Sequence, residues 1–217
     1  MKKILVLIAT LFTVMCASAS NVEKIQFANA GKFSLGVMSG FPFFGKGVER
    51  DMPFISLDAM IGLKDGFCHT NKFGDNGAID LGLYIGYARN EYEHHDWVFN
   101  EDVQAMEDLE EHTWLSWAIP VSVRSAFHWE FVKNLDVYAG LQLGCSYYGA
   151  RGTSALSGKE TETSQFDFFL CHYLGVKWMF TNHFGVKAEC NTSCIFDGNP
   201  DREHNFPVAS VGLQFNF

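Results

Sequence analysis

The feature that most limits the possible folds is a strict two-residue alternation at the end of the chain. Residues 207–217 read PVASVGLQFNF, with an apolar side chain at every second position from Ala209 to Phe217. Small or polar residues occupy the positions between them. A repeat of two is the side-chain period of a β-strand, so this segment predicts a strand with one apolar and one polar face.

The same alternation recurs seven times upstream, and each apolar face is opposed by Gly, Ser or charged residues. The predicted strands occupy 32–41, 53–63, 77–88, 113–126, 135–147, 166–180, 184–193 and 207–217. Pro120 lies inside the fourth strand, where it cannot donate a ladder hydrogen bond, and predicts a bulge there. The longest connection is 89–112, and its second half, 101–112, is compatible with a short helix.

The first nineteen residues predict a secretory signal peptide. Lys2 and Lys3 precede an apolar stretch, 4–14, and an Ala-Ser-Ala cleavage site ends at residue 19. Cys16 leaves a lipoprotein signal as an alternative. The mature domain is then 20–217, and because no later stretch reaches ~18 consecutive apolar residues, we expect no transmembrane helix.

The mature chain is strongly acidic. It carries 14 basic and 25 acidic residues, a formal charge of −11, because Lys2 and Lys3 are the charged residues of the signal peptide. Nucleic acid is therefore not an expected partner. The mature chain also has five cysteines, an odd number that cannot all pair within one chain. A Cys190–Cys194 bridge and unpaired thiols on strand faces both remain open.

Eight amphipathic strands, each near the ~9–11 residues that a tilted strand needs to cross a membrane, predict an all-β fold. The predicted architecture is an eight-stranded antiparallel transmembrane β-barrel, closed because lipid offers no hydrogen-bond partner to a strand edge. The alternation of long and short connections places both termini in the periplasm. A secreted β-sandwich is the alternative, and the charged second face of the strands argues against it.

Several segments resemble the small outer-membrane β-barrel family, the "outer membrane protein β-barrel domain" group that includes OmpA-like and opacity-like barrels. The segments are 117–121 (WAIPV) with Arg124, 138–144 (YAGLQLG), 181–189 (TNHFGVKAE) and 211–217 (VGLQFNF). The resemblance covers nearly the whole mature chain. It implies the barrel fold and the outer membrane of a Gram-negative bacterium, and it implies little about activity.

Seven charged residues fall on the predicted inner face and form the candidate site: Asp58, Asp80, Arg124, Asp136, Lys177, Lys187 and Glu189. In a barrel of eight strands the lumen is just wide enough for side chains to fill. Pairs between these charges predict a structural plug, and the alternative is a gate of a narrow pore. The apolar residues Leu213, Phe215 and Phe217 are the candidate assembly signal, which the resemblance implies is read by the barrel assembly machinery.

The acidic connection 89–112 predicts a solvated surface loop, and collection of divalent cations by its carboxylates is the alternative. Some small barrels modify lipid A with a His–Ser pair, but no His here is followed at one or two residues by Ser. We therefore expect no enzyme, no cofactor and no metal site.

The sequence thus predicts a monomeric, non-enzymatic barrel in contact with outer-membrane lipid and lipopolysaccharide. Its expected role is envelope integrity or surface interaction through long outer loops. The alternatives are a narrow diffusion pore and a lipid A-modifying barrel enzyme.

Overall fold

The computed structural model describes residues 30–41, 50–67, 77–100, 105–132, 134–154, 160–196 and 209–217. In these ranges there is no helix with the length and hydropathy needed to cross a membrane. The predicted signal peptide, 1–19, lies outside the described residues. The eight strands are β1 (Phe33–Phe41), β2 (Arg50–Phe67), β3 (Gly77–Asn100), β4 (Ala105–Val132), β5 (Leu135–Ser154), β6 (Glu160–Met179), β7 (Phe184–Phe196) and β8 (Ala209–Asn216).

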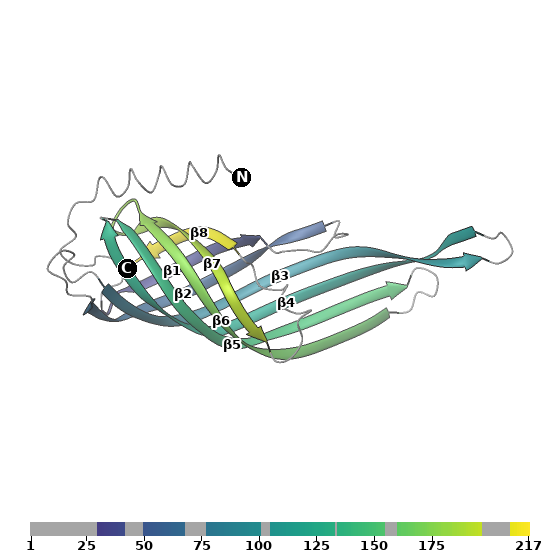
Figure 1. The fold of residues 1–217 in the computed structure, drawn as a ribbon, viewed down its shortest axis with the longest axis horizontal. Helices are drawn as coiled ribbons and strands as arrows, with labels where there is room; N and C mark the ends of the chain where they lie inside the picture. The colour runs from purple at the N-terminus through teal and green to yellow at the C-terminus, as the bar shows by residue number, and fades with distance from the viewer. Residues whose placement is uncertain are drawn as a thin grey trace.

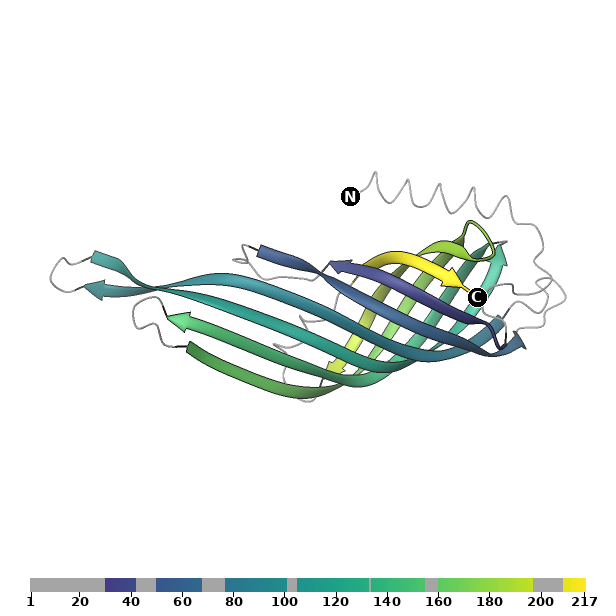
Figure 2. The ribbon, with the colours of Figure 1, turned by 180° about the vertical axis from the view of Figure 1, so that it is seen from behind.

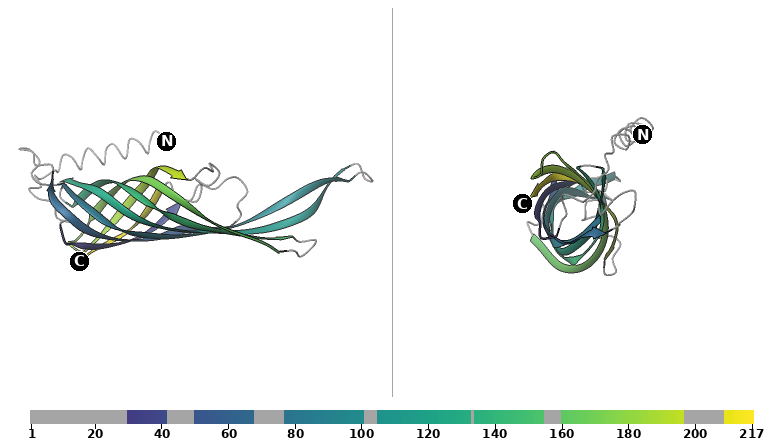
Figure 3. Two further views of the ribbon diagram at one scale, coloured as in Figure 1. Left: turned by 90° about the horizontal axis from the view of Figure 1, so that it is seen from below. Right: turned by 90° about the vertical axis from the view of Figure 1, so that its left-hand side faces the viewer.

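The strands form a closed barrel in which each strand pairs antiparallel with its neighbours in the sequence. The ring closes between the first and last strands, from the pair Ser34–Asn216 to the pair Phe41–Ala209. The end-on view of Figure 3 shows the ring directly. The predicted fold class, an antiparallel eight-stranded barrel, is confirmed.

The barrel is apolar outside and polar inside, as the alternation predicts. Exposed apolar side chains occur on all eight strands, and they belong to the faces predicted to be apolar. Examples, one per strand, are Val37, Leu57, Leu83, Val123, Leu143, Leu174, Val186 and Leu213. A closed ring leaves no backbone edge within the wall, which is the arrangement that hydrocarbon requires.

Aromatic rings cluster at both ends of this apolar wall. At one end Phe184 lies 5.9 Å from Phe180 and 5.5 Å from Phe215, measured between ring centroids. Toward the other end the rings of Tyr147 and Phe166 are 4.9 Å apart. Two aromatic girdles flanking an apolar band are typical of transmembrane barrels.

The two ends of the barrel differ (Figures 1 and 2). At one end β4 and β5 are separated by residues 133 and 134, and β6 and β7 by 180–183. The described ends of the chain lie there too, since Phe217 N–H donates to the carbonyl of Phe33. At the other end β3, β4, β5 and β6 continue far beyond β1, β7 and β8.

Strands β2 to β7 are longer than the sequence predicts, and this corrects the interpretation of 89–112. β3 continues to Asn100 and β4 begins at Ala105, so neither a long loop nor a helix over 101–112 is present in the described part of that segment. β3 and β4 pair from Tyr92–Trp114 to Asn100–Ala105, and beyond His112, the last β4 residue paired with β5, they form a two-stranded ribbon. Long-range strand pairing overrides the local helical preference of its acidic residues.

Pro120 does not produce the predicted bulge. The β3–β4 pairing has the same register on both sides of it, at Ile85–Val121 and Ala88–Ala118. Pro120 is buried, and a Cβ on Gly86 would lie 3.0 Å from its ring and would overlap the ring of Phe54. A glycine on the neighbouring strand thus accommodates the proline without a change of register.

The structure rules out the Cys190–Cys194 bridge that the sequence left open. Cys190 is an exposed free thiol and Cys145 is also free. Cys171 takes part in a disulfide and is fully buried on the inner face of β6. A bridge involving Cys190 is therefore excluded.

Candidate functional site: the charged lumen

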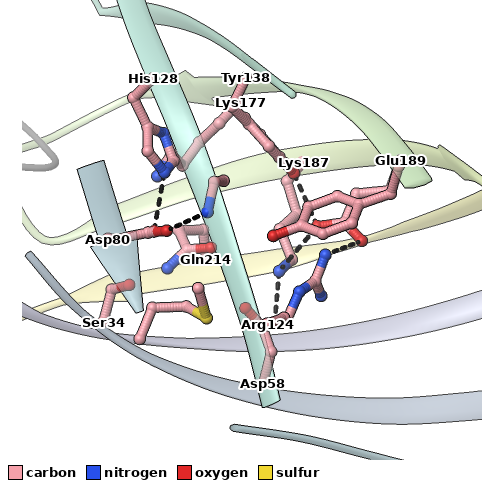
Figure 4. A pocket seen from close by; sticks show the side chains of 13 residues that line it. Ser34, Asp58, Asp80, Arg124, His128, Tyr138, Lys177, Lys187, Glu189 and Gln214 are labelled. Carbon is pink, nitrogen blue, oxygen red and sulfur yellow. Dashed lines mark hydrogen bonds and ion pairs between the residues drawn. The ribbon is translucent and has the colours of Figure 1, made fainter. Parts of the chain in front are cut away.

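All seven charged residues predicted for the inner face point into the lumen and are buried. They come from the six strands β2 to β7, and Figure 4 shows most of them gathered in one place. They reach the lumen because each stands at a polar position of an alternating strand. They separate into two clusters, which we call the outer cluster (Asp58, Arg124, Lys187, Glu189) and the inner cluster (Asp80, His128, Asp136, Lys177).

The outer cluster joins β2, β4 and β7 by ion pairs. Arg124 Nη2 donates to Glu189 Oε2 at 2.9 Å. Lys187 Nζ donates to Asp58 Oδ1 and also lies 3.6 Å from Glu189 Oε1. The cluster contains two cations and two anions, so its formal charge is zero.

Tyrosine rings enclose the guanidinium of Arg124. Its Cζ lies 3.9 Å from the centroid of Tyr173 and 5.2 Å from that of Tyr84. Nε and Nη1 have no hydrogen-bond partner among the described residues. Cation–π contact with the two rings therefore supplies part of the solvation that these nitrogens lose on burial. Tyr138 Oη adds a hydrogen bond to Glu189 Oε1 at 2.8 Å.

The inner cluster is organised around His128, which the sequence analysis placed in a connection and did not select. Its Nδ1 lies 2.7 Å from Asp136 Oδ2, and its Nε2 lies 2.7 Å from Asp80 Oδ2. Lys177 Nζ lies 3.2 Å from the same Asp136 oxygen. Asp80 Oδ1 accepts a hydrogen bond from the Ala126 amide at 3.0 Å.

The geometry around His128 defines its charge. An ionised carboxylate can only accept, so both short contacts are hydrogen bonds only when both ring nitrogens carry protons. That form is the imidazolium. With it the inner cluster has two cations and two anions, whereas a neutral ring would leave one buried carboxylate uncompensated.

Buried side chains fill the lumen on both sides of these charges along the barrel axis. On the side of the projecting strands lies a buried apolar cluster that includes Met38, Phe54 and Phe169. On the side of the tight turns Met179 and Leu135 are buried. The cavity among the charged side chains measures about 20 Å³, which is close to the space that one water molecule needs.

Sequence reasoning found the seven charges and missed His128, Tyr138 and Tyr173. The alternation could have identified His128, because this residue follows Arg124 by four positions and therefore lies on the same face of β4. The predicted end of the fourth strand at residue 126 removed His128 from consideration. The tyrosines at inner positions carried no signal beyond the alternation itself.

The candidate assembly residues lie at the end of the chain. Leu213 and Phe217 are exposed on the outer face, and Phe215 packs with Phe184 on the same face. They lie in or next to β8, which pairs with both β7 and β1. Their recognition during assembly stays a prediction.

Metal binding has no support in the described side chains. Among them no group of three or more His, Cys, Asp and Glu is arranged to hold an ion. The side chains of the acidic ribbon tip, 92–100 and 105–114, lie outside the described part of the structure, so cation binding by that segment stays a hypothesis.

A closed antiparallel ring with an apolar exterior, aromatic girdles and a charged interior defines a transmembrane β-barrel. The family model "Outer membrane protein beta-barrel domain" matches residues 7–217. The chain belongs to this family, and the resemblance seen in the sequence is confirmed.

Several solved outer-membrane proteins are similar to this chain at low sequence identity. Ail, the attachment invasion locus protein of Yersinia pestis, is 13% identical, with 87% of this chain and 99% of that chain covered and a TM-score of 0.38. OprG from Pseudomonas aeruginosa is 14% identical, with 89% and 99% covered and a TM-score of 0.38.

A major outer membrane protein from Thermus thermophilus is 11% identical, with 87% and 100% covered and a TM-score of 0.48. No match was found among curated proteins.

Proposed function

We propose that this protein is a monomeric, non-enzymatic outer-membrane barrel of a Gram-negative bacterium that acts by surface interaction through its projecting strands. The observation that carries the proposal is the continuation of β3, β4, β5 and β6 beyond the ring. Both termini then lie in the periplasm, on the side of the tight turns. The apolar wall contacts outer-membrane lipid, and its outer leaflet side contacts lipopolysaccharide.

The projecting part is a built structure with regular pairing. The outermost β2–β3 pair is Arg50–Glu91, and β3 and β4 continue past it to Asn100–Ala105. On the other side β5 and β6 pair out to Thr153–Glu160, well past the outermost β6–β7 pair, Phe169–Phe196. We call these residues, 92–100, 105–117, 148–154 and 160–165, the projecting sheet (left panel of Figure 3).

The described surface of the projecting sheet suits contact with water-soluble macromolecules. Residues 160–165 of β6 are exposed and polar, and Arg151 forms an exposed ion pair with Glu162 at 3.5 Å. Among the described residues, residues 160–164 of β6 pair with β5 alone, so the second edge of this segment offers backbone hydrogen-bonding groups. Such an edge can take up an extended segment of another chain.

The packed lumen argues against the narrow-pore alternative. Its charges are paired within the outer and inner clusters, and the apolar cluster with Met38, Phe54 and Phe169 covers them. We expect the purified protein to give no stable conductance in planar bilayers at physiological salt. Stepwise channel openings in the wild-type protein would overturn this part of the proposal.

The buried acidic and basic side chains form ion pairs with one another. This pairing supports a non-enzymatic role, because none of these groups is left to act on a substrate. Lipid A mass spectra from a strain lacking the protein should match those of the parent strain. A missing or additional acyl chain would instead favour the lipid-modifying alternative.

The projecting sheet can be tested by shortening it. A variant in which 92–112 is replaced by a two-residue turn keeps every strand pair of the ring, so we expect it to show the same heat-modifiable band on detergent gels. Proteases added to intact cells should cleave the wild-type protein within 92–112. Wild-type protein in nanodiscs should bind members of an array of extracellular proteins and glycans, and the shortened variant should lose that binding.

Equal array binding by both proteins would contradict the proposed role of the sheet. Resistance of intact cells to cleavage, with cleavage only after the outer membrane is permeabilised, would contradict the orientation.

A further inference from the structure

Cys171, the buried cysteine of β6, is disulfide-bonded, and its partner can be inferred from the positions of the other cysteines. Cys171 takes part in a disulfide and lies in the apolar cluster that covers the charged lumen. Cys145 and Cys190 are free, so within the mature chain the possible partners are Cys68 and Cys194. Cys68 and Cys194 lie at different distances from Cys171.

Cys68 follows Phe67, the last residue of β2, at the end with the tight turns. Phe54 on the same strand belongs to the cluster that contains Cys171. Residues 54 and 67 are thirteen positions apart, which at ~3.3 Å per residue is on the order of 40 Å along the strand. A disulfide allows at most about 7 Å between Cα atoms, so Cys68 is out of reach.

Cys194 occupies the register position directly opposite Cys171. Opposite residues of an antiparallel pair have Cα atoms ~4.5–5.5 Å apart, within the range that a disulfide spans. We propose that Cys171 and Cys194 form a disulfide that staples β7 to β6 inside the barrel mouth.

A register shift explains how Cys194 can share a face with Cys171 although Cys190 lies on the lipid side. Residues four apart on a regular strand share a face, and Cys190 is exposed on the outer face. Between the pairs Tyr173–Asn191 and His172–Ser193, β7 contains one extra residue, Thr192. Such an insertion moves the positions beyond it to the opposite face, so the position of Cys194 belongs to the inner face.

The staple lies on a part of β7 that is paired on one side only among the described residues. The pairing of β7 with β8 ends at Cys190–Ala209, and among the described residues Asn191–Phe196 pairs with β6 alone. A strand end held on one side frays, because few contacts oppose its opening. A covalent bond four positions beyond the last β7–β8 pair holds this end against the apolar cluster.

The bond forms by oxidation of the two thiols. Two protons and two electrons leave the cysteines, and the electrons pass by thiol–disulfide exchange to the disulfide of a periplasmic thiol oxidant, which becomes a dithiol. The periplasm is an oxidising compartment in which such bonds persist.

The direct test is proteolysis of the purified wild-type protein without reductant, after alkylation of free thiols, followed by mass spectrometry. We expect one linked peptide pair joining Cys171 to Cys194, with Cys68, Cys145 and Cys190 alkylated. Deleting Thr192 should abolish the linked pair, whereas Cys190→Ser should leave it intact. A wild-type digest in which Cys171 is alkylated or linked to another cysteine would overturn the proposal.

Stability supplies a second measurement on folded protein. In detergent micelles, reductant should raise the unfolded-to-folded ratio in urea by about tenfold or more for the wild type and for Cys190→Ser. The Cys171→Ser variant should respond to urea equally with and without reductant. An identical response of all three proteins to reductant would contradict a stabilising bond at this position.

Discussion

At the scale of single residues, the stability of the lumen depends on matched charges with almost no access to water. Arg124 and Glu189 are 2% and 7% exposed, and their ion pair measures 2.9 Å. Removing one member of such a pair leaves the other buried and uncompensated, which is far more costly than losing a surface pair. Arg151 and Glu162, at 49% and 58% exposure, provide the natural comparison in the same chain.

We expect Arg124→Met to destabilise the barrel by about 3–5 kcal/mol, because Glu189 loses its charged partner and the tyrosine rings lose a cation. Arg151→Met should change the free energy of unfolding by less than about 1 kcal/mol. Urea unfolding in micelles, followed by tryptophan fluorescence, measures both. Equal losses for the two variants would show that the outer cluster is not a stabilising plug.

His128 allows a test of charge balance. The His128→Gln variant replaces a cation with a neutral side chain between Asp80 and Asp136, so we expect it to unfold at lower urea concentration than the wild type. Adding Asp80→Asn removes the uncompensated charge, and the double variant should recover part of the loss. If the effects of the two substitutions on the free energy of unfolding are additive, a charged His128 does not bridge the two aspartates.

Parity along a strand was sufficient to predict the inward charges but not their partners. Each of the seven charges could be assigned to the inner face from its own strand, because the period of two needs no knowledge of the fold. Which charges meet depends on register across the ring, for example between Arg124 on β4 and Glu189 on β7. That register is set by long-range pairing, which a single sequence does not encode locally.

At the scale of elements, β5 and β6 fit together through reciprocal tyrosine–glycine pairs. Tyr173 on β6 is paired in register with Gly140 on β5, and Tyr138 on β5 with Gly175 on β6. A Cβ on Gly140 would overlap the ring of Tyr173 and lie 2.5 Å from the Ser125 carbonyl oxygen. The glycines therefore leave the space that the two tyrosine rings occupy.

We expect Gly140→Ala to destabilise the folded barrel by about 1–3 kcal/mol, since the added methyl group meets a backbone oxygen that cannot move aside. Ala139→Val, which enlarges the neighbouring residue on the exposed outer face, is the matched control and should have little effect. The readout is the temperature at which the folded band converts to the unfolded band on detergent gels. A larger shift for Ala139→Val would contradict the packing argument.

Strand ends were less predictable than strand faces. The sequence interpretation ends the third strand at residue 88 and begins the fourth at 113, because polar residues replace the apolar alternation there. In the structure β3 continues to Asn100 and β4 begins at Ala105, and the two strands stay paired over this stretch. Hydrophobic periodicity marks only the part of a strand that contacts lipid, so strands that leave the membrane carry no such signal.

At the scale of the whole molecule, the ring depends on its last strand, because β8 must pair on both sides before any edge is closed. Phe217 is adjacent to β8 and 65% exposed, and its ring lies 6.0 Å from that of Phe33. These contacts join the end of the chain to its first strand. The barrel therefore closes through the contact of β8 and Phe217 with β1.

Deletion of Phe217 should reduce the amount of folded protein in the outer membrane, in line with the predicted role of Leu213, Phe215 and Phe217 as an assembly signal. Phe180→Ala removes another exposed phenylalanine, 56% exposed, from the same end of the barrel and serves as the control. Heat-modifiable protein in outer-membrane fractions is the measurement. Equal folded yields for the deletion and the control would remove the special role of the terminal residue.

The projecting sheet has a mechanical consequence. Its strands are the same strands that form the barrel wall, with no linker between the two parts. Tension applied at the tip therefore runs along continuous backbones, and the ladder hydrogen bonds, which lie perpendicular to the strands, share the load in shear. A pulling force at the tip would therefore act directly on the ring, and the sheet would separate only when many hydrogen bonds break together.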